Sequence, residues 1–308
     1  MTASPPENQP IDPDSTNEEG SEPLSTTRYD EMADGYATFW APVLRESAER
    51  LLEHLDLAIV GTGAPPRREG VADVEAVRLL DVGSGTGTLA LAALRRWPNV
   101  EVTGVDPSSG MLEVARRTAD EGLAPEAAAR FETVVAYADE LPDSIGDFHA
   151  AMSSFVLQLV PNRAAALREV RRRLRPGGTF AWVTWQLTER SFEPDRVANA
   201  VLDDFGFDPP EADTRPGDVA SAAAAALAMR RAGFRDVTAW SDELTHAWDA
   251  RGYLEFLTEF DEASLFADLE PEERRQIEAR ILDGLQQLTR DALTLRLPIV
   301  YARGTNPG

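Results

Sequence analysis

Short apolar runs alternate with helical stretches between residues 77 and 185, and this alternation is the main signal in the chain. The apolar runs have the length of strands, and the stretches between them place apolar residues on one helix face. We expect strands at residues 77–82, 100–105, 131–135, 148–153 and 179–185, and helices at residues 86–96, 109–120 and 162–174. Strands that alternate with helices predict an α/β domain built on a parallel sheet.

The segments on either side of this core differ from it in pattern. Residues 1–26 carry acids, Pro, Ser and Thr with almost nothing to bury, so we expect a disordered acidic tail. Residues 27–60 hold apolar side chains spaced for an N-terminal helical segment, and the Gly- and Pro-rich residues 61–76 indicate a loop. Residues 77–185 form the expected core. Residues 186–308 form an irregular, helix-rich region that ends in strand-like runs.

Charge narrows the range of partners. The chain has 53 acidic and 30 basic side chains, a formal net charge of -23, and every basic side chain is Arg. Such a charge opposes non-specific attraction to nucleic acid and to anionic membranes. The arginines of residues 168–175 are expected to form a solvated helix face rather than a binding patch.

The chain shows no targeting or metal-binding pattern. No apolar run reaches about 18 residues, and the N-terminus has no basic start or apolar core, so we expect a cytoplasmic protein without membrane insertion. The absence of Cys excludes disulfides, thiolate metal sites and a cysteine nucleophile. The histidines, His54, His149 and His246, lack the paired spacing of zinc ligands, so no metal site is expected.

A glycine-rich turn joins the first expected strand to the first expected helix. Residues 81–87 read DVGSGTG. Glycines let the backbone turn sharply and let a ligand approach closely, while N–H groups at a helix start favour negative charge. The spacing is G-x-G-x-G rather than the longer G-x-G-x-x-G of dinucleotide-binding folds. Alone, the turn fits either a nucleotide-like ligand or a structural cap.

Asp106 ends the second expected strand, at the same edge of the sheet as this turn. A carboxylate there can accept both hydroxyls of a ribose. It can also cap the helix that is expected to begin near Ser109. An acid and a glycine turn at neighbouring strand ends together favour a ligand that carries a nucleoside.

Three motifs in order make the chain resemble a known family. Residues 79–87 (LLDVGSGTG), 102–106 (VTGVD) and 174–178 (LRPGG) are similar to those of class I S-adenosylmethionine-dependent methyltransferases, most of all the branch of quinone-biosynthesis and other small-molecule enzymes. The likeness spans residues 29–185. It implies S-adenosylmethionine as cofactor and a doubly wound, mostly parallel seven-stranded sheet of the Rossmann-like methyltransferase type. It also implies that residues 186–308 supply a helical cap and the final antiparallel strands.

The resemblance implies roles for individual residues. Asp81 and the glycine backbone would face the methionine end of the cofactor, Asp106 would bind the ribose, and the backbone of Ala138 would meet the adenine ring. Ser153, at the end of the fourth strand, would border the sulfonium. The residues implied in cofactor binding are Asp81, Gly83, Ser84, Gly85, Gly87, Asp106, Pro107, Met111, Ala138, Asp139 and Ser153.

Two positions depart from the family pattern. Tyr137 stands where an Asp usually accepts a hydrogen bond from the adenine amino group, so that contact is lost, altered or taken by Asp139. Pro298 falls at the start of the family's last strand, and proline is disfavoured inside an interior strand. We therefore expect this strand to begin at Ile299.

Methyl transfer from a sulfonium needs little acid or base catalysis, because the leaving group is neutral. The main task of the protein is to align the acceptor and exclude water. A general base would serve only a hydroxyl, a protonated amine or a weakly acidic carbon. The candidates are Tyr29, Tyr36 and His149, followed by Gln158 and His246.

Large apolar rings are frequent in the N-terminal segment and in residues 186–308. They favour a small hydrophobic or aromatic acceptor, although most of them equally suit the core of a helical cap. The leading hypothesis is therefore S-adenosylmethionine-dependent methylation of such an acceptor. One alternative is a non-catalytic cofactor-binding regulatory protein of the same fold, suggested by Tyr137. A nicotinamide-dependent oxidoreductase is another, which the glycine spacing disfavours.

Overall fold

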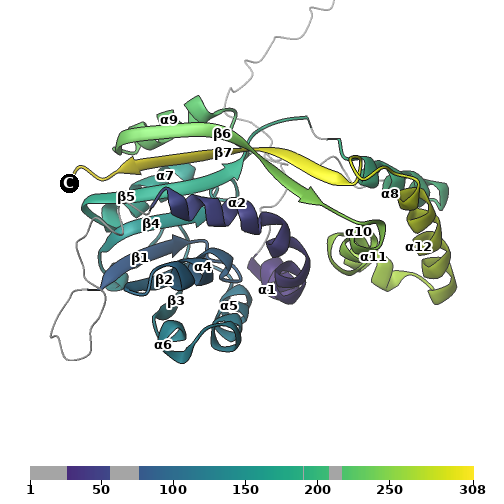
Figure 1. Ribbon diagram of the computed structural model, residues 1–308, viewed down its shortest axis with the longest axis horizontal. Coiled ribbons are helices and arrows are strands. Elements are labelled where there is room, and N and C mark those ends of the chain that lie inside the picture. The colour runs from purple at the N-terminus through teal and green to yellow at the C-terminus, as the bar shows by residue number, and fades with distance from the viewer. Residues whose placement is uncertain (1–25, 56–75, 190, 208–216) are drawn as a thin grey trace, which may run out of the picture.

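The fold is a seven-stranded sheet with helices on both faces (Figure 1). The structure, a computed structural model, describes residues 26–55, 76–189, 191–207 and 217–308. The strands are β1 (Val77–Val82), β2 (Val100–Asp106), β3 (Phe131–Val135), β4 (Phe148–Ser154), β5 (Leu174–Trp185), β6 (Arg235–Ala247) and β7 (Thr294–Thr305). Their order is β3-β2-β1-β4-β5-β7-β6, with β7 antiparallel to both neighbours and the other pairs parallel. The expected doubly wound, mostly parallel sheet is confirmed.

Two apolar layers bury the two faces of this sheet. The helices are α1 (Thr26–Gly35), α2 (Ala41–Glu53), α4 (Thr88–Arg96), α5 (Ser109–Gly122), α6 (Pro125–Ala128), α7 (Arg163–Arg173), α8 (Glu193–Asp204), α9 (Ala222–Arg231), α10 (Ala250–Phe256), α11 (Ala263–Asp268) and α12 (Pro271–Gln286). Leu79 of β1 lies in the core formed with α2 and α4, and its neighbour Leu80 lies in the core formed with α7 and α9. Successive side chains of a strand point to opposite faces, so a strand buried on both faces is apolar throughout.

A helical cap lies beyond the ends of β6 and β7 (Figure 1). Helices α8, α10, α11 and α12 surround a core of their own, in which Tyr253, Phe256 and Phe266 are buried. Most rings of the C-terminal third therefore serve the cap itself. Two π-helical segments, η1 (Tyr36–Trp40) and η3 (Leu257–Asp261), bring the N-terminal region and the cap into contact, because Phe260 packs on Tyr36 with ring centroids 6.4 Å apart.

The expected start of the last strand at Ile299 is wrong, because β7 runs from Thr294 with Pro298 inside it. The carbonyl of Pro298 accepts a hydrogen bond of 2.9 Å from the N–H of Gln186, the residue after β5. The nitrogen and carbonyl of one strand residue point to the same side. The missing N–H of proline therefore faces the end of β5, and the pairing of Pro298 with Glu243 of β6 is preserved.

The start of β5 also differs from the expected strand at residues 179–185. Residues 174–178 already belong to β5, and the register with β4 shifts between Phe148 and Ala150. Gly177, with a φ of 80°, provides the left-handed backbone that this irregularity needs. The side chain of Asn306 fixes it by donating to the carbonyl of Leu174 at 2.7 Å.

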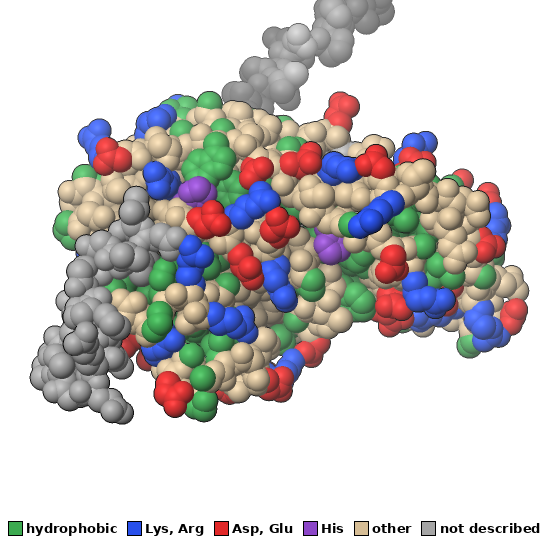
Figure 2. Space-filling view, viewed as in Figure 1, with side chains coloured by type: hydrophobic (Ala, Val, Ile, Leu, Met, Phe, Trp, Pro, Cys, Tyr) green, Lys and Arg blue, Asp and Glu red, His purple; other side chains and the backbone are tan. Residues whose placement is uncertain are grey.

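The surface and the helices add two observations. On the face shown in Figure 2, arginine and acidic side chains are interspersed. Within the described ranges, no helix has both the length and the apolar character needed to cross a bilayer.

Two expected segments lie outside the described residues. They are the acidic tail of residues 1–26, apart from Thr26 in α1, and the loop of residues 61–76, apart from its last residue.

Candidate active site

The glycine turn connects β1 to α4 and needs three left-handed residues. Gly83, Gly85 and Gly87 have φ angles of 69°, 53° and 83°. A Cβ on Gly83 would lie 2.3 Å from the Val156 side chain, so only glycine fits there. A Cβ on Gly85 would meet no atom within 4 Å. The turn is therefore closed on the side of β4 and open at Gly85, where a ligand can approach the backbone.

Asp81 lies buried beneath this turn, with 1% of its surface exposed. Its carboxylate accepts a hydrogen bond of 2.9 Å from the Ser84 hydroxyl and another from the backbone N–H of Ala90 in the first turn of α4. Burial is the main cause that raises the pKa of Asp81 to about 7, and the negative charge of Asp106 adds to it. A carboxylate in such a place is suited to a cationic ligand.

Asp106 ends β2 beside the turn. One carboxylate oxygen accepts from the N–H of Gly85 at 2.9 Å, and the other accepts from the N–H of Ser108 at 3.0 Å. Burial raises the pKa of Asp106 as well. The alternative that Asp106 is itself the cap of α5 is not what the structure shows, because the Ser108 hydroxyl caps this helix by accepting from the N–H of Met111.

Helix α1 lies against α5 and covers the same edge of the sheet. The Asp30 carboxylate accepts 2.7 Å hydrogen bonds from the Ser108 hydroxyl and the Gly110 N–H. Tyr29 and Tyr36 pack with Met111 in a small apolar cluster between α1 and α5. Burial, followed by the neighbouring Tyr29 and Asp106, raises the pKa of Tyr36. Tyr36 is therefore close to Asp106 and stays protonated, which suits a hydrogen-bond donor better than a base.

The segment after β3 forms another side of the site. The N–H of Ala136 donates to the carbonyl of Asp106 at 3.1 Å, and Ala138 is buried, while Asp139 is partly buried. Tyr137 is 55% exposed, and its hydroxyl lies 3.2 Å from that of Thr26. The Tyr137 side chain therefore lies at the surface, whereas the neighbouring Ala138 is buried.

The end of β4 completes this edge. The Ser153 hydroxyl donates to the carbonyl of Val82 at 2.8 Å, which ties β4 to β1. The next turn contains Phe155, a left-handed residue with a φ of 54°. Sequence reasoning missed Phe155 and Val156, because no residue pattern marks a left-handed Phe. Strained backbone of this kind clusters at functional sites.

His149 was a candidate base, and the structure places it elsewhere. It is the second residue of β4, level with the start of β1, where its Nδ1 accepts from the N–H of Arg78 at 3.0 Å. Its Nε2 lies 2.9 Å from Arg175. The glycine turn is at the carboxyl ends of the strands, so His149 lies at the opposite edge of the sheet.

Gln158 and His246 are engaged in structural contacts. The Gln158 amide donates to the carbonyl of Phe155 at 2.7 Å and accepts from the Thr184 hydroxyl at 2.6 Å. His246 packs on Trp248 with ring centroids 4.5 Å apart. The amide nitrogen and oxygen of Gln158 are thus both engaged, and His246 lies near the end of β6 in contact with the cap.

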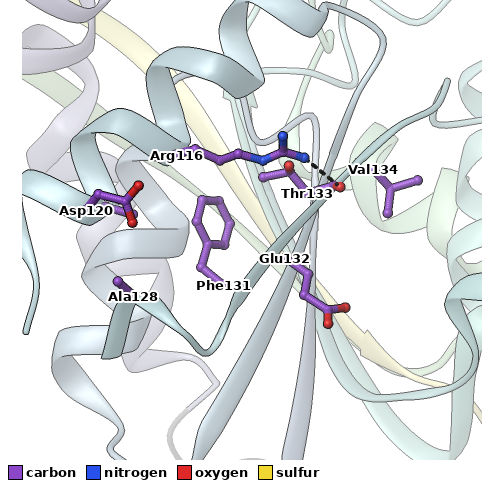
Figure 3. A pocket seen from close by; sticks show the side chains of 8 residues that line it. Arg116, Asp120, Ala128, Phe131, Glu132, Thr133 and Val134 are labelled. Atoms are coloured by element: carbon purple, nitrogen blue, oxygen red, sulfur yellow. Dashed lines mark hydrogen bonds between the residues drawn. The ribbon is translucent and has the colours of Figure 1, made fainter. Parts of the chain in front are cut away.

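A cavity of about 400 Å³ lies away from this site (Figure 3). Side chains of β3 and α5 line it, including Thr133, Phe131 and Arg116. Arg116 donates to the carbonyl of Thr133 at 3.2 Å. The cavity therefore belongs to the outer edge of the sheet, where β3 has no further strand beside it.

Known proteins resemble this chain in the part that contains the glycine turn and Asp106. Residues 79–178 match the family model described as a methyltransferase domain. Residues 79–178 therefore form a methyltransferase domain. The resemblance on which the sequence interpretation rested is thereby confirmed, and the methyltransferase domain includes the glycine turn, Asp106 and the ends of β3 and β4.

Curated relatives of the methyltransferase domain include two bacterial enzymes. A ubiquinone/menaquinone biosynthesis C-methyltransferase of Methylobacterium nodulans is 39% identical over 104 residues, which cover 33% of this chain and 40% of the relative. A malonyl-acyl-carrier-protein O-methyltransferase of Halorhodospira halophila is 32% identical over 161 residues, which cover 52% of this chain and 45% of the relative. The chain spans less than half the length of these relatives.

Solved structures support the fold. The (4+2)-cyclase SpnF aligns with a TM-score of 0.51 and 19% identity, covering 91% of this chain and 97% of that chain. At this identity the likeness concerns the fold alone. Because the methyltransferase fold is shared with a protein named a cyclase, the function has to be argued from the site.

Proposed function

We propose that the protein transfers a methyl group from S-adenosylmethionine to a small hydrophobic or aromatic acceptor. The observation that carries this proposal is a pair of carboxylates, the buried Asp81 and the partly buried Asp106, on either side of the open Gly85 backbone. Asp81 suits the positively charged methionine end of that cofactor, and Asp106 suits the ribose hydroxyls.

The same pair disfavours the nicotinamide-dependent alternative. The charge of Asp106 already raises the pKa of Asp81, and two carboxylates beside the glycine turn would repel a pyrophosphate placed there. A cation close to Asp81 lowers that pKa instead. The donor set therefore fits a cationic nucleoside better than a dinucleotide.

The residues of this chain have binding and orienting roles in the proposed reaction. When bound, S-adenosylmethionine supplies a methyl group activated by its sulfonium. Asp81 would hold the cationic end, and Asp106 would hold the ribose while it keeps Gly85 in place. Pro107 and Met111 would pack on the adenine. Helix α1 covers this edge and limits the access of water, which aligned methyl transfer requires.

The acceptor class is inferred from the rings near this edge. Tyr36, Trp40 and Phe260 are partly buried and so leave apolar surface at the junction of η1, η3 and the methyltransferase domain. Trp40 packs on Trp185 and Phe256, with ring centroids 6.4 Å and 5.7 Å apart. Names of relatives, which include quinone and malonyl-carrier methyltransferases, agree with a small-molecule acceptor.

Titration calorimetry with S-adenosylmethionine and with S-adenosylhomocysteine tests the cofactor assignment. Binding in the micromolar range is expected, and no heat at millimolar ligand would contradict the proposal. Release of S-adenosylhomocysteine in the presence of phenols, quinols and aryl carboxylates then tests methyl transfer. Tight cofactor binding without transfer across such a panel would instead favour the regulatory alternative.

A further inference from the structure

Arg173 is the buried member of the arginine run in α7. Its side chain is 6% exposed, whereas that of the neighbouring Arg172 is 50% exposed. The expectation of a solvated arginine face therefore does not extend to this residue. A guanidinium is rarely buried, because removing its charge from water is costly unless hydrogen bonds compensate.

The partners of Arg173 lie in the segment that follows the candidate adenine contacts. One Nη donates to the carbonyl of Leu141 at 2.7 Å and also pairs with the Asp143 carboxylate. Its buried Nε has no hydrogen-bond partner among the described residues. Arg173 is thus buried with one N–H unpaired among the described residues, while its Nη holds the carbonyl of Leu141 and pairs with Asp143.

That carbonyl closes a short turn beside the proposed ribose site. The turn begins at Ala136, whose N–H is bonded to the carbonyl of Asp106, and the N–H of Glu140 donates to the carbonyl of Tyr137 at 3.1 Å. Arg173 fixes the other end at Leu141. Only residues 137–140 lie between the two attachments, so their backbone is held in one place relative to Asp106.

We propose that Arg173 is a positioning residue for cofactor binding. From the last position of α7 it holds the 137–140 turn in the conformation that receives the adenosine. This inference rests on the proposed function. A turn that is already ordered costs less conformational entropy on binding, so the clamp raises affinity without touching the ligand. It acts in binding and not in the transfer step.

Arg172 provides a matched control. It pairs with the same Asp143 carboxylate at 2.7 Å, but it is half exposed, and its other ion pair is with Glu169 in the same helix. Arg172→Met therefore removes an equal charge from the same helix and the same ion-pair cluster. It leaves the attachment of the turn intact.

The experiment compares Arg173→Met, Arg173→Lys and Arg172→Met with the wild type. We expect Arg173→Met to weaken S-adenosylhomocysteine binding about tenfold or more, to raise the KM for S-adenosylmethionine and to leave kcat at saturation within about twofold. Arg173→Lys, which keeps a donor, should recover part of the affinity. Arg172→Met should bind as the wild type does. Hydrogen exchange should be faster at residues 137–141 in Arg173→Met only.

Several results would overturn the inference. Unchanged S-adenosylhomocysteine affinity in Arg173→Met, or an equal loss in Arg172→Met, would do so, as would a fall in kcat with KM unchanged. If Arg173→Met does not fold, the test uses Arg173→Lys, whose affinity for S-adenosylhomocysteine should then be lower than those of the wild type and Arg172→Met. Absence of cofactor binding by the wild type would contradict the proposed function. The hydrogen-exchange rates at residues 137–141 would then show separately whether Arg173 orders the turn, because only Arg173→Met should raise them.

Discussion

The N–H of Gly85 donates a 2.9 Å hydrogen bond to the Asp106 carboxylate, which joins the glycine turn after β1 to the end of β2. This contact fixes the relative position of two groups that were singled out separately in the sequence. The other oxygen of the same carboxylate holds the N–H of Ser108 at the start of α5. Asp106 is therefore a structural link as well as the proposed ribose ligand.

Substitution of Asp106 should separate these two roles. We expect Asp106→Ala to weaken S-adenosylhomocysteine binding by roughly 2 to 5 kcal/mol, because charge-assisted hydrogen bonds to the ribose and to Gly85 are both lost. Asp106→Asn, which keeps one acceptor oxygen, should lose less. Calorimetry measures both, and Asp120→Asn on the exposed side of α5 is the control. Unchanged affinity in Asp106→Ala would mean that the ribose lies elsewhere.

The raised pKa of Asp81 predicts that the stability of the protein without cofactor depends on pH. Its pKa is raised from 3.8 to about 7 by burial, so the folded state favours the protonated form. The stabilising contribution is complete below about pH 4 and is lost as the pH rises through about 7. A shift of about three units corresponds to roughly 4 kcal/mol. The stabilities of the wild type and Asp81→Asn, measured by urea denaturation, should therefore agree below about pH 4, separate between about pH 4 and 7, and differ by a constant amount above that.

The affinity for the cofactor should rise with pH because of Asp81, whereas the stability of the protein without cofactor falls. A cationic ligand near Asp81 stabilises the carboxylate, so affinity should rise between about pH 6 and 8 and a proton should be released at the lower pH. Calorimetry in two buffers of different ionisation enthalpy measures this proton. Asp81→Asn should remove the release. Proton uptake by the wild type on binding would show that the cation is not placed at Asp81.

The sequence predicted the parts of the site that depend on local pattern. The glycine turn and Asp106 follow from residue types at strand ends, and strand ends follow from apolar runs. His149 shows the limit of this reasoning, since its place at the amino end of β4 was implied by the strand boundary and was not used. Only the carboxyl ends of parallel strands meet the glycine turn.

Features that depend on contacts between distant segments could not be predicted. Pro298 is tolerated within β7 because β5 ends beside it, and the position of that end is not a property of either segment alone. The burial of Arg173 depends on Leu141, 32 positions earlier in the chain. The packing of η1 on η3 joins segments that share no sequence pattern.

Gln158 should act on the site through the backbone of Phe155. Its amide bonds to Thr184 and to the carbonyl of Phe155, which help to hold that left-handed residue and the adjoining Val156 against Gly83. We expect Gln158→Leu to destabilise the fold by about 1 to 3 kcal/mol, because a buried hydroxyl and a carbonyl lose their partners. Gln158→Glu, which retains an acceptor for Thr184, should be milder in thermal unfolding. Equal melting temperatures for wild type and Gln158→Leu would contradict this role.

Tyr253 and Asp195 supply a test of the cap. The Tyr253 hydroxyl donates to the Asp195 carboxylate, which joins α10 to α8, and both groups have raised pKa values mainly because they are buried. Tyr253→Phe removes the donor and should cost about 1 to 3 kcal/mol of stability.

The loss in Tyr253→Phe should depend on pH in a defined direction. A raised carboxyl pKa means that the folded state favours the protonated form, so Asp195 destabilises the fold as the pH rises through its pKa. Without the Tyr253 hydroxyl, that pKa rises further, and the variant should lose more stability at pH 8 than at pH 4. Tyr137→Phe removes an exposed hydroxyl and should change stability by less than about 0.5 kcal/mol at either pH. A loss in Tyr253→Phe that is the same at both pH values would show that the hydroxyl does not support the ionised carboxylate.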